Sequence, residues 1–194
     1  MNDLLNLIKT RRSIRNYKQE EIPEEIINRI IEAGNDAPSG MNSQPWRFVV
    51  VRSSKIRNKM LETAIPTAKK ILEGIKTTNP ERYNLIMNRY EQLEDPIYYS
   101  APVIIFVIGK GPYAASSCPL ACQNIMLAAY SLGLGSCWVG FGSLVTDNDE
   151  IVKSLDLKND EKIFGPILLG YPEVTPEPPV KKPPDIKWLN DSHS

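Results

Sequence analysis

The chain is organised around Ala37-Pro38-Ser39-Gly40-Met41-Asn42-Ser43-Gln44-Pro45-Trp46, a polar loop between a helical pattern and the strand-like run 47–51. Its two prolines and one glycine exclude a regular helix or strand from this stretch. Ser39, Asn42, Ser43 and Gln44 supply neutral hydrogen-bond donors and acceptors close together in the sequence. Groups of this kind suit a flat heteroaromatic ligand, although the same side chains can also satisfy the backbone of their own loop.

Length and charge limit the classes of protein to which the chain can belong. Its 194 residues, 42% of them hydrophobic, are enough for one core and predict a single domain. The 23 basic residues balance the 23 acidic ones, so no overall basic field favours a nucleic-acid partner, and any anion site must be local. Because no apolar run approaches the ~20 residues that span a bilayer, and the first residues lack a signal pattern, we expect a cytoplasmic protein with no membrane partner.

Apolar periodicity predicts alternating helices and strands. The strand patterns are β-branched or continuously apolar and are bounded by glycine or proline, whereas the helical patterns repeat at three and four residues. We expect strands at 48–51, 103–108, 135–140 and 163–169. We expect helices from Leu4 to the first arginines, from Pro23 to Gly34, around 56–64, at two places within 66–99, from Pro119 to Gly133, and at 147–155. The run 103–108 is uniformly apolar, which predicts a central strand covered on both faces.

The sequence beyond Gly170 differs from the rest of the chain. Six prolines fall between positions 172 and 184, and they exclude helix and favour an extended arm. Ile186, Trp188 and Leu189 near its end predict that the arm docks on another surface. We therefore divide the chain into a domain at 1–170 and an arm at 171–194.

Several kinds of catalytic site are excluded by the residues that the chain lacks. The single histidine, His193, is the penultimate residue, so neither a nucleophile–histidine pair nor a metal site is expected. Cys118 and Cys122 share a helical face but have no histidine nearby, which favours buried free thiols. The pair Gly133 and Gly135 follows a helix rather than a strand and does not form a dinucleotide fingerprint. If the protein is an enzyme, a cofactor must supply the chemistry.

Three arginines, Arg11, Arg12 and Arg15, fall within five residues at the end of the first predicted helix. They can be a solvated helix terminus, where cations suit the helix dipole. Alternatively, they can form a phosphate clamp with the hydroxyl of Ser13, because guanidinium groups match phosphate oxygens. Lys181 and Lys182 form a second basic pair in the arm.

At this point the sequence resembles the FMN-dependent nitroreductases, and the resemblance covers nearly the whole chain in order. The matching motifs are Arg-Arg-Ser-x-Arg at 11–15, Ala-Pro-Ser-x-x-Asn-x-Gln-Pro-Trp at 37–46, Ala-Pro-Val-x-Ile at 101–105, Gln-Asn-x-Met-Leu-Ala-Ala at 123–129, Leu-Gly-Leu-Gly-Ser-Cys-Trp-Val-Gly at 132–140, Gly-Tyr-Pro at 170–172 and Lys-Lys-Pro at 181–183. No single motif is decisive, but the ordered set is specific. The resemblance implies an α+β fold with a central mixed sheet of about four strands flanked by helices, to which a partner's arm can add a fifth.

The resemblance also implies a set of FMN-binding residues. Arg11, Arg12, Ser13, Arg15, Lys181 and Lys182 match the positions that hold the phosphate and ribityl chain, and Cys137, Trp138, Val139 and Gly140 match the strand beside the flavin. Pro38, Ser39, Gly40 and Asn42, with Gln44 close behind, match a loop that reaches the flavin of the partner subunit. The Gly140 N–H matches the donor to flavin N5. Some members carry a glutamate where this chain has Val139, so any role of that carboxylate is lost or moved here.

We therefore expect a homodimer with shared flavin sites and no catalytic side chain of its own. Its activity would be the transfer of a hydride from NADH or NADPH through FMN to a nitroaromatic, quinone or similar small acceptor by a ping-pong mechanism. The same resemblance leaves open reductive dehalogenation, a flavin-modifying activity and a non-catalytic FMN-binding or redox-sensing role.

Overall fold

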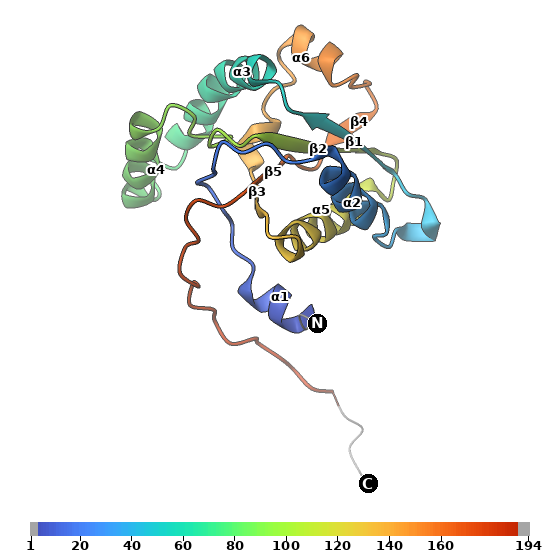
Figure 1. Ribbon diagram of the computed structural model, residues 1–194. Coiled ribbons are helices and arrows are strands. Elements are labelled where there is room, and N and C mark those ends of the chain that lie inside the picture. The colour runs from blue at the N-terminus through green and yellow to red at the C-terminus, as the bar shows by residue number, and fades with distance from the viewer. Residues whose placement is uncertain (1–3, 190–194) are drawn as a thin grey trace.

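The strand β2, Val103–Lys110, runs through the centre of the computed structural model, which describes residues 4–189 (Figure 1). Its side chains alternate between two hydrophobic cores. Val103, Ile105 and Val107 pack into one core, and Ile104, Phe106 and Ile108 pack into the other. All six are at most 1% exposed, so the predicted central strand covered on both faces is confirmed.

Four strands of the sheet follow the order β1-β2-β5-β3. Besides β2, these are β1 Trp46–Val51, β5 Ile167–Gly170 and β3 Gly135–Trp138. The fifth strand, β4 Glu161–Ile163, lies outside this order and pairs with β2. The α+β class is confirmed. The expected mixed sheet is corrected in one respect, since all four ladders between these strands are antiparallel. All five strands belong to one chain, and a further strand from a partner stays a prediction.

The predicted strand at 163–169 is interrupted by a bulge. The N–H groups of Phe164 and Gly165 both donate to the carbonyl oxygen of Val107, at 2.8 and 3.4 Å. The register along β2 consequently slips by one residue, from the pair Ile108 and Ile163 to the pair Ile105 and Ile167. β4 and β5 therefore lie end to end beside β2 rather than forming one regular strand.

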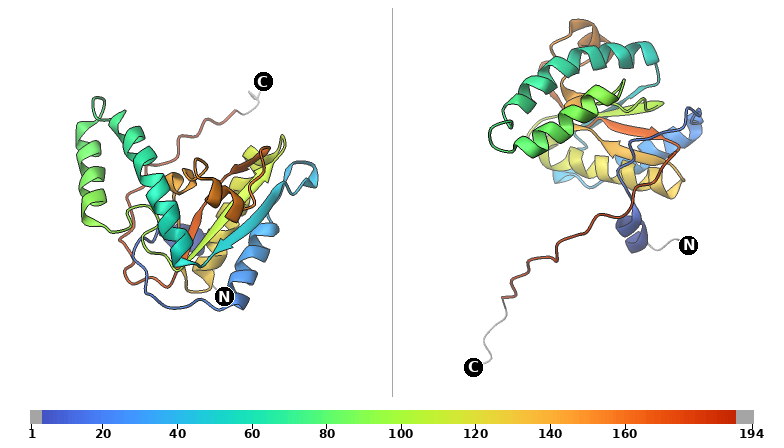
Figure 2. Two further views of the ribbon diagram at one scale, coloured as in Figure 1. Left: turned by 90° about the horizontal axis from the view of Figure 1, so that it is seen from above. Right: turned by 90° about the vertical axis from the view of Figure 1, so that its left-hand side faces the viewer.

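Helices cover both faces of the sheet (Figure 2). The helices α2, Glu24–Asn35, and α5, Ala114–Ser131, supply the core that contains Val103. The helices α3, Ser54–Glu73, and α6, Asp149–Ser154, supply the core that contains Phe106. The helix α4, Pro80–Gln92, lies beside α3 at the periphery, and α1, Leu4–Thr10, lies near the arm (Figure 2).

Two prolines that were expected to bound helices lie inside them instead. Pro66 is within α3, and Pro119 is within α5, which begins at Ala114. A proline removes one backbone hydrogen bond, but packing can outweigh this loss. In α3 the buried positions Met60, Ala64, Ala68 and Leu72 recur every four residues through Pro66. The sequence prediction missed this continuity because it treated Pro66 as a helix boundary and did not follow the four-residue apolar repeat beyond it.

The arm contains no helix or strand between residue 171 and Leu189, as its prolines predict. Its first residues are tied to the domain, since the N–H of Lys18 donates to Tyr171 O at 3.0 Å and the N–H of Glu173 donates to Asn16 O at 3.0 Å. The arm then runs out past α1 (Figure 1). Trp188 and Leu189 are 78% and 83% exposed in the single chain, so docking of the arm stays a prediction. His193 lies outside the described residues.

Among the helices of residues 4–189, none combines the length and the apolar character that a membrane crossing requires.

Candidate functional site

The predicted phosphate-binding segment lies against strand β3. Ser13 forms an isolated parallel bridge with Ser136, and the N–H of Ile14 donates to Ser136 O at 2.9 Å. The approach is so close that a Cβ atom on Gly135 would lie 2.6 Å from Cγ1 of Ile14. Gly135 is therefore required by packing, which brings residues 11–15 beside residues 137–140 although the two stretches are far apart in sequence.

Arg11, Ser13 and Arg15 surround the buried thiol of Cys137. Burial raises the pKa of this thiol, whereas the nearby guanidinium groups of Arg15 and Arg11 and a hydrogen bond with Ser13 act in the opposite direction. Nη1 of Arg11 is buried and has no hydrogen-bond partner among the described residues. A buried cationic donor without an acceptor is costly, so this position is suited to an anion supplied from outside the chain.

Arg12 is held differently from its neighbours. Its Nη1 donates to the backbone oxygens of Lys9 at 3.0 Å and Arg11 at 2.9 Å. The first carbonyl lies in the last turn of α1 and the second directly follows the helix, where a cation also suits the helix dipole. Of the three arginines, Arg12 thus matches the alternative of a helix terminus, and Arg11 matches the alternative of an anion clamp.

A cavity of about 400 Å³ lies where β3 ends, and it brings Arg15 together with Trp138, Val139 and Gly140. Gly140 is the first residue of a short 3-10 helix, η2 Gly140–Ser143, where a backbone N–H has no acceptor within the helix. A Cβ atom on Gly140 would meet nothing within 4 Å. Neither packing within this chain nor a positive φ requires glycine here, and the open space leaves room for a flat ligand against the backbone.

The far wall of this cavity comes from residues that the sequence prediction did not assign. The remaining lining residues are Arg82, Ile86, Arg89, Tyr90, Pro96, Ile97, Tyr99 and Phe141. Four of them belong to α4 and three to the loop that follows it. The hydroxyl of Tyr90 is buried without a partner among the described residues, and burial raises its pKa to about 12. Tyr90 is therefore a neutral phenol with a free donor at physiological pH.

Asp95 shapes the loop after α4. Its Oδ1 accepts from the N–H of Tyr98 at 2.6 Å, and its Oδ2 accepts from the N–H of Ser100 at 3.0 Å. Tyr99 and Ser100 adopt the left-handed region, with φ of 53° and 52°, which is unfavourable for residues other than glycine. Tyr98 in turn donates its hydroxyl to Gly142 O at 2.9 Å and so joins this loop to η2. The dipeptide Asp95-Pro96 is the sequence signal from which this turn could have been found.

The polar loop 37–46 does not reach this cavity in its own chain. It contains the 3-10 turn η1, Gly40–Asn42, and packs near the start of α5, where the N–H of Gly40 donates to Oγ of Ser117 at 3.3 Å. Its other bonds are local: Ser39 Oγ accepts from the N–H of Gln44 at 3.0 Å, and Nε2 of Gln44 donates to Oδ1 of Asn42 at 3.3 Å. The loop thus satisfies part of its own backbone, which was one of the two alternatives from sequence.

Gly40 and Met41 define the tip of this loop. A Cβ atom on Gly40 would lie 2.5 Å from Cδ1 of Tyr113, so the ring of Tyr113 requires glycine at this position. Met41 and Asn42 have φ values of 54° and 53°, and Met41 is 86% exposed. A strained loop with an exposed methionine is available for contact with another molecule.

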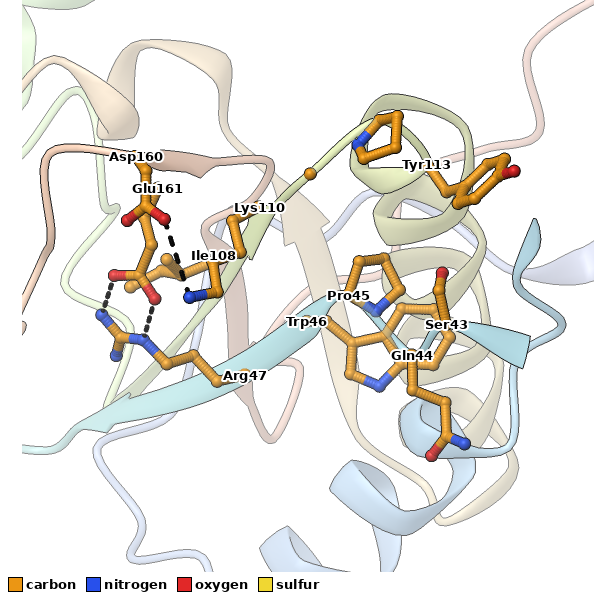
Figure 3. A pocket seen from close by; sticks show the side chains of 12 residues that line it. Ser43, Gln44, Pro45, Trp46, Arg47, Ile108, Lys110, Tyr113, Asp160 and Glu161 are labelled. Atoms are coloured by element: carbon orange, nitrogen blue, oxygen red, sulfur yellow. Dashed lines mark hydrogen bonds and ion pairs between the residues drawn. The ribbon is translucent and has the colours of Figure 1, made fainter. Parts of the chain in front are cut away.

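A second cavity, of about 480 Å³, lies beside this loop and includes Ser43 and Gln44 (Figure 3). Its charged groups are already paired. Arg47 donates to both carboxylate oxygens of Glu161 at 2.7 Å, and Nζ of Lys110 lies 3.6 Å from Oδ2 of Asp160. Because these charged side chains already neutralise one another, the second cavity offers no free charge to a ligand. The cavity at Gly140 is therefore the better candidate site. Lys181 and Lys182 are exposed in the arm and contribute to neither cavity.

Comparison with known proteins finds relatives that align with most of this chain. A family model described as the nitroreductase family matches residues 8–171. A relative from Methanothermobacter thermautotrophicus, provisionally named an NADH dehydrogenase/NAD(P)H nitroreductase, is 34% identical over 180 residues, which cover 90% of this chain and 80% of the relative. An iodotyrosine deiodinase from Thermotoga neapolitana is 28% identical over 175 residues, which cover 89% of this chain and 90% of that protein.

Solved structures extend the likeness to the fold. The crystal structure of a nitroreductase with bound FMN from Desulfitobacterium hafniense has a TM-score of 0.80 and 31% identity, covering 98% of this chain and 100% of that chain. The agreement covers the domain and most of the arm. The chain therefore belongs to the nitroreductase family of oxidoreductases.

Proposed function

We propose that the protein is an NAD(P)H-dependent FMN oxidoreductase that reduces a nitroaromatic, a quinone or a similar small acceptor. The observation that carries this proposal is the buried, unpartnered Nη1 of Arg11, which lies near Cys137 in the strand that leads to the open backbone of Gly140 in the cavity. An anion at Arg11 and a flat ring at Gly140 are the two parts of a flavin mononucleotide. Membership of the nitroreductase family supports the same assignment.

The residues present fit FMN. Phosphate carries roughly −1.5 to −2 charges at neutral pH and needs more than one cation nearby. Arg11 and Arg15 flank Cys137 and can meet that need, with the hydroxyl of Ser13 as an additional donor. Arg12 supports the segment by holding the end of α1, and Lys181 and Lys182 are proposed to add positive charge once the arm is docked.

When bound, FMN supplies the acceptance of a hydride and its delivery as two electrons. The residues of this chain would bind FMN and orient its ring. The N–H of Gly140 is proposed to donate to N5 of the flavin ring and so to stabilise the negative charge that develops on it. The first two-electron reduction of a nitro compound balances as ArNO₂ + NAD(P)H + H⁺ → ArNO + NAD(P)⁺ + H₂O.

Dimerisation is part of the proposal. Within one chain the residues Pro38, Ser39, Gly40, Asn42 and Gln44 lie away from the cavity at Gly140, and so does the basic pair of the arm. If these residues bind FMN, a second subunit must bring them to it. We therefore propose a homodimer with shared sites; a cytoplasmic location stays a prediction.

The test is the absorption spectrum of the purified protein, followed by anaerobic titration with NADH and with NADPH and then by addition of a nitroaromatic. A flavin spectrum that is bleached by one or both nucleotides and restored by the acceptor is the expected result. A colourless protein that takes up no FMN would overturn the assignment. A flavin that neither nucleotide reduces would leave an FMN-binding or redox-sensing role instead.

Reductive dehalogenation is the second candidate, because the iodotyrosine deiodinase of Thermotoga neapolitana aligns with most of this chain. Halide release from a halogenated phenol by the reduced protein, measured against nitroaromatic turnover, separates the two activities. A higher kcat/KM for the halogenated phenol would favour dehalogenation.

A further inference from the structure

Two arginines of α4, Arg82 and Arg89, face the cavity at Gly140. Together with Ile86 and Tyr90 they fall at spacings of three, four, seven and eight residues, which place them on one face of the helix. Neither arginine has an ion-pair partner among the described residues. The neighbouring acids on the helix, Glu81 and Glu91, do not line the cavity.

The cavity as a whole has a one-sided charge. Its twelve lining residues include three arginines, at positions 15, 82 and 89, and no aspartate or glutamate. Arg15 belongs to the segment proposed to hold FMN, which leaves Arg82 and Arg89 without an assigned anion. A cluster of unpaired guanidinium groups at a partly enclosed site attracts an anionic ligand.

Aromatic rings and a free phenol complete this wall. Tyr90, Tyr99, Trp138 and Phe141 all line the cavity, and rings of this kind favour a flat aromatic ligand. The hydroxyl of Tyr90 is buried and unpartnered, so it can donate to a ligand oxygen.

We propose that the electron acceptor is a small aromatic molecule with an anionic substituent such as a carboxylate, and that Arg82 and Arg89 bind that substituent. This inference rests on the proposed function, since it concerns the second substrate of the same site. NAD(P)H also carries anionic phosphates, so the experiment must separate the acceptor from the nucleotide.

The probes are 4-nitrobenzoate and its neutral counterpart 4-nitrobenzamide, used with the FMN-loaded protein. The variants are Arg82→Gln, Arg89→Gln and their combination, and the control is Arg29→Gln, which removes an exposed charge from α2 outside the cavity. Rapid mixing of the prereduced protein with each acceptor isolates the acceptor step from the nucleotide step. Calorimetry with the oxidised protein measures binding of each probe without turnover.

We expect the double variant to lose at least about tenfold in rate constant and in affinity for 4-nitrobenzoate, because charge-assisted contacts are lost. The values for 4-nitrobenzamide and those of the Arg29→Gln control should stay within about twofold of wild type, the scatter of surface substitutions. Higher salt should weaken binding of the carboxylate only. Tyr90→Phe should weaken binding of both probes, since both present an oxygen to the phenol.

Equal losses for the two probes, or a loss confined to reduction by NAD(P)H, would overturn the inference and assign the arginines to general packing or to the nucleotide. If the wild-type protein shows no turnover but binds 4-nitrobenzoate through these arginines, the proposed function fails and the anion site stands. If turnover is normal but the carboxylate has no advantage, the proposed function stands and the anion site fails.

Discussion

Arg15 lies over the ring of Tyr99, with the guanidinium carbon 5.9 Å from the ring centroid. This distance is within the range of a cation–π contact. The contact joins the segment beside β3 to the loop after α4, and Gln19 reinforces it by donating to Ser100 O at 3.2 Å. Arg15, which is proposed to bind the cofactor, is thus positioned by the loop after α4, a loop that the sequence analysis did not assign to the site.

Replacing Asp95 by Ala should lower the free energy of unfolding by roughly 2–3 kcal/mol, because three backbone N–H groups lose a buried carboxylate acceptor. Thermal unfolding and urea titration measure the loss. Glu94→Ala, which removes an adjacent exposed carboxylate, is the control and should change stability by less than about 0.5 kcal/mol. Equal stability of the two variants would show that Asp95 does not hold the loop.

Replacing Arg11 and Arg15 together by Ala should lower FMN affinity at least about tenfold, because charge-assisted contacts to phosphate are each worth about 1.5–3 kcal/mol. Fluorescence quenching of FMN on titration with protein gives the dissociation constant. Lys18→Ala, at an exposed position outside the cavity, should leave that constant unchanged. Unaltered affinity in the double variant would contradict the phosphate assignment.

The pair Arg47 and Glu161 should make stability depend on pH in the acid range. The hydrogen bonds from Arg47 lower the pKa of Glu161 from 4.5 to about 2. The carboxylate therefore contributes its full stabilisation above about pH 4.5 and loses it as pH falls toward 2.

Glu161→Gln should accordingly cost about 2 kcal/mol at pH 7, and the difference from wild type should shrink below about pH 4.5. Denaturant titrations at a series of pH values test both statements. Asp160→Asn, in the exposed pair with Lys110, is the comparison and should cost less than about 1 kcal/mol. A difference for Glu161→Gln that stays constant down to pH 3 would argue against the lowered pKa.

Turnover should follow ping-pong kinetics if nucleotide and acceptor use the cavity at Gly140 in succession. Double-reciprocal plots at several fixed acceptor concentrations should then be parallel. Intersecting lines would indicate a complex that holds both substrates together.

Ending the chain after Gly170 should abolish both dimerisation and FMN binding. The exposed apolar residues at the end of the arm need a partner surface, and the arm also carries Lys181 and Lys182. Light scattering gives the mass and absorption gives the bound flavin. Replacing Lys181 and Lys182 by Ala should weaken FMN binding and leave the dimer intact, which separates the two roles of the arm. A truncated protein that stays dimeric and yellow would show that the arm serves neither.

The sequence by itself determined the elements whose pattern is local. The uniformly apolar run of β2 could only be a strand covered on both faces, and the isoleucines of α2 at helical spacing predicted its buried side. The ordered motifs indicated the family without any knowledge of contacts. The spacing of apolar residues is enough to predict these elements, because the buried face of a helix or strand repeats over a few residues along the sequence.

Tertiary structure alone decided how the candidate site is assembled. It placed Arg11 and Arg15 beside Cys137 through the close approach of Ile14 to Gly135, and it separated the loop at Gly40 from the cavity of the same chain. It also let α3 continue past Pro66, because burial of the apolar face of the helix can outweigh one missing backbone hydrogen bond.

The part of the cavity wall that α4 forms was also not visible in the sequence. Arg82, Arg89 and Tyr90 look like ordinary residues of a polar helix until the fold turns their common face toward Trp138 and Gly140. A site of this kind depends on contacts between residues that are distant along the chain, and those contacts are fixed by the packing of whole elements rather than by the pattern within any one of them.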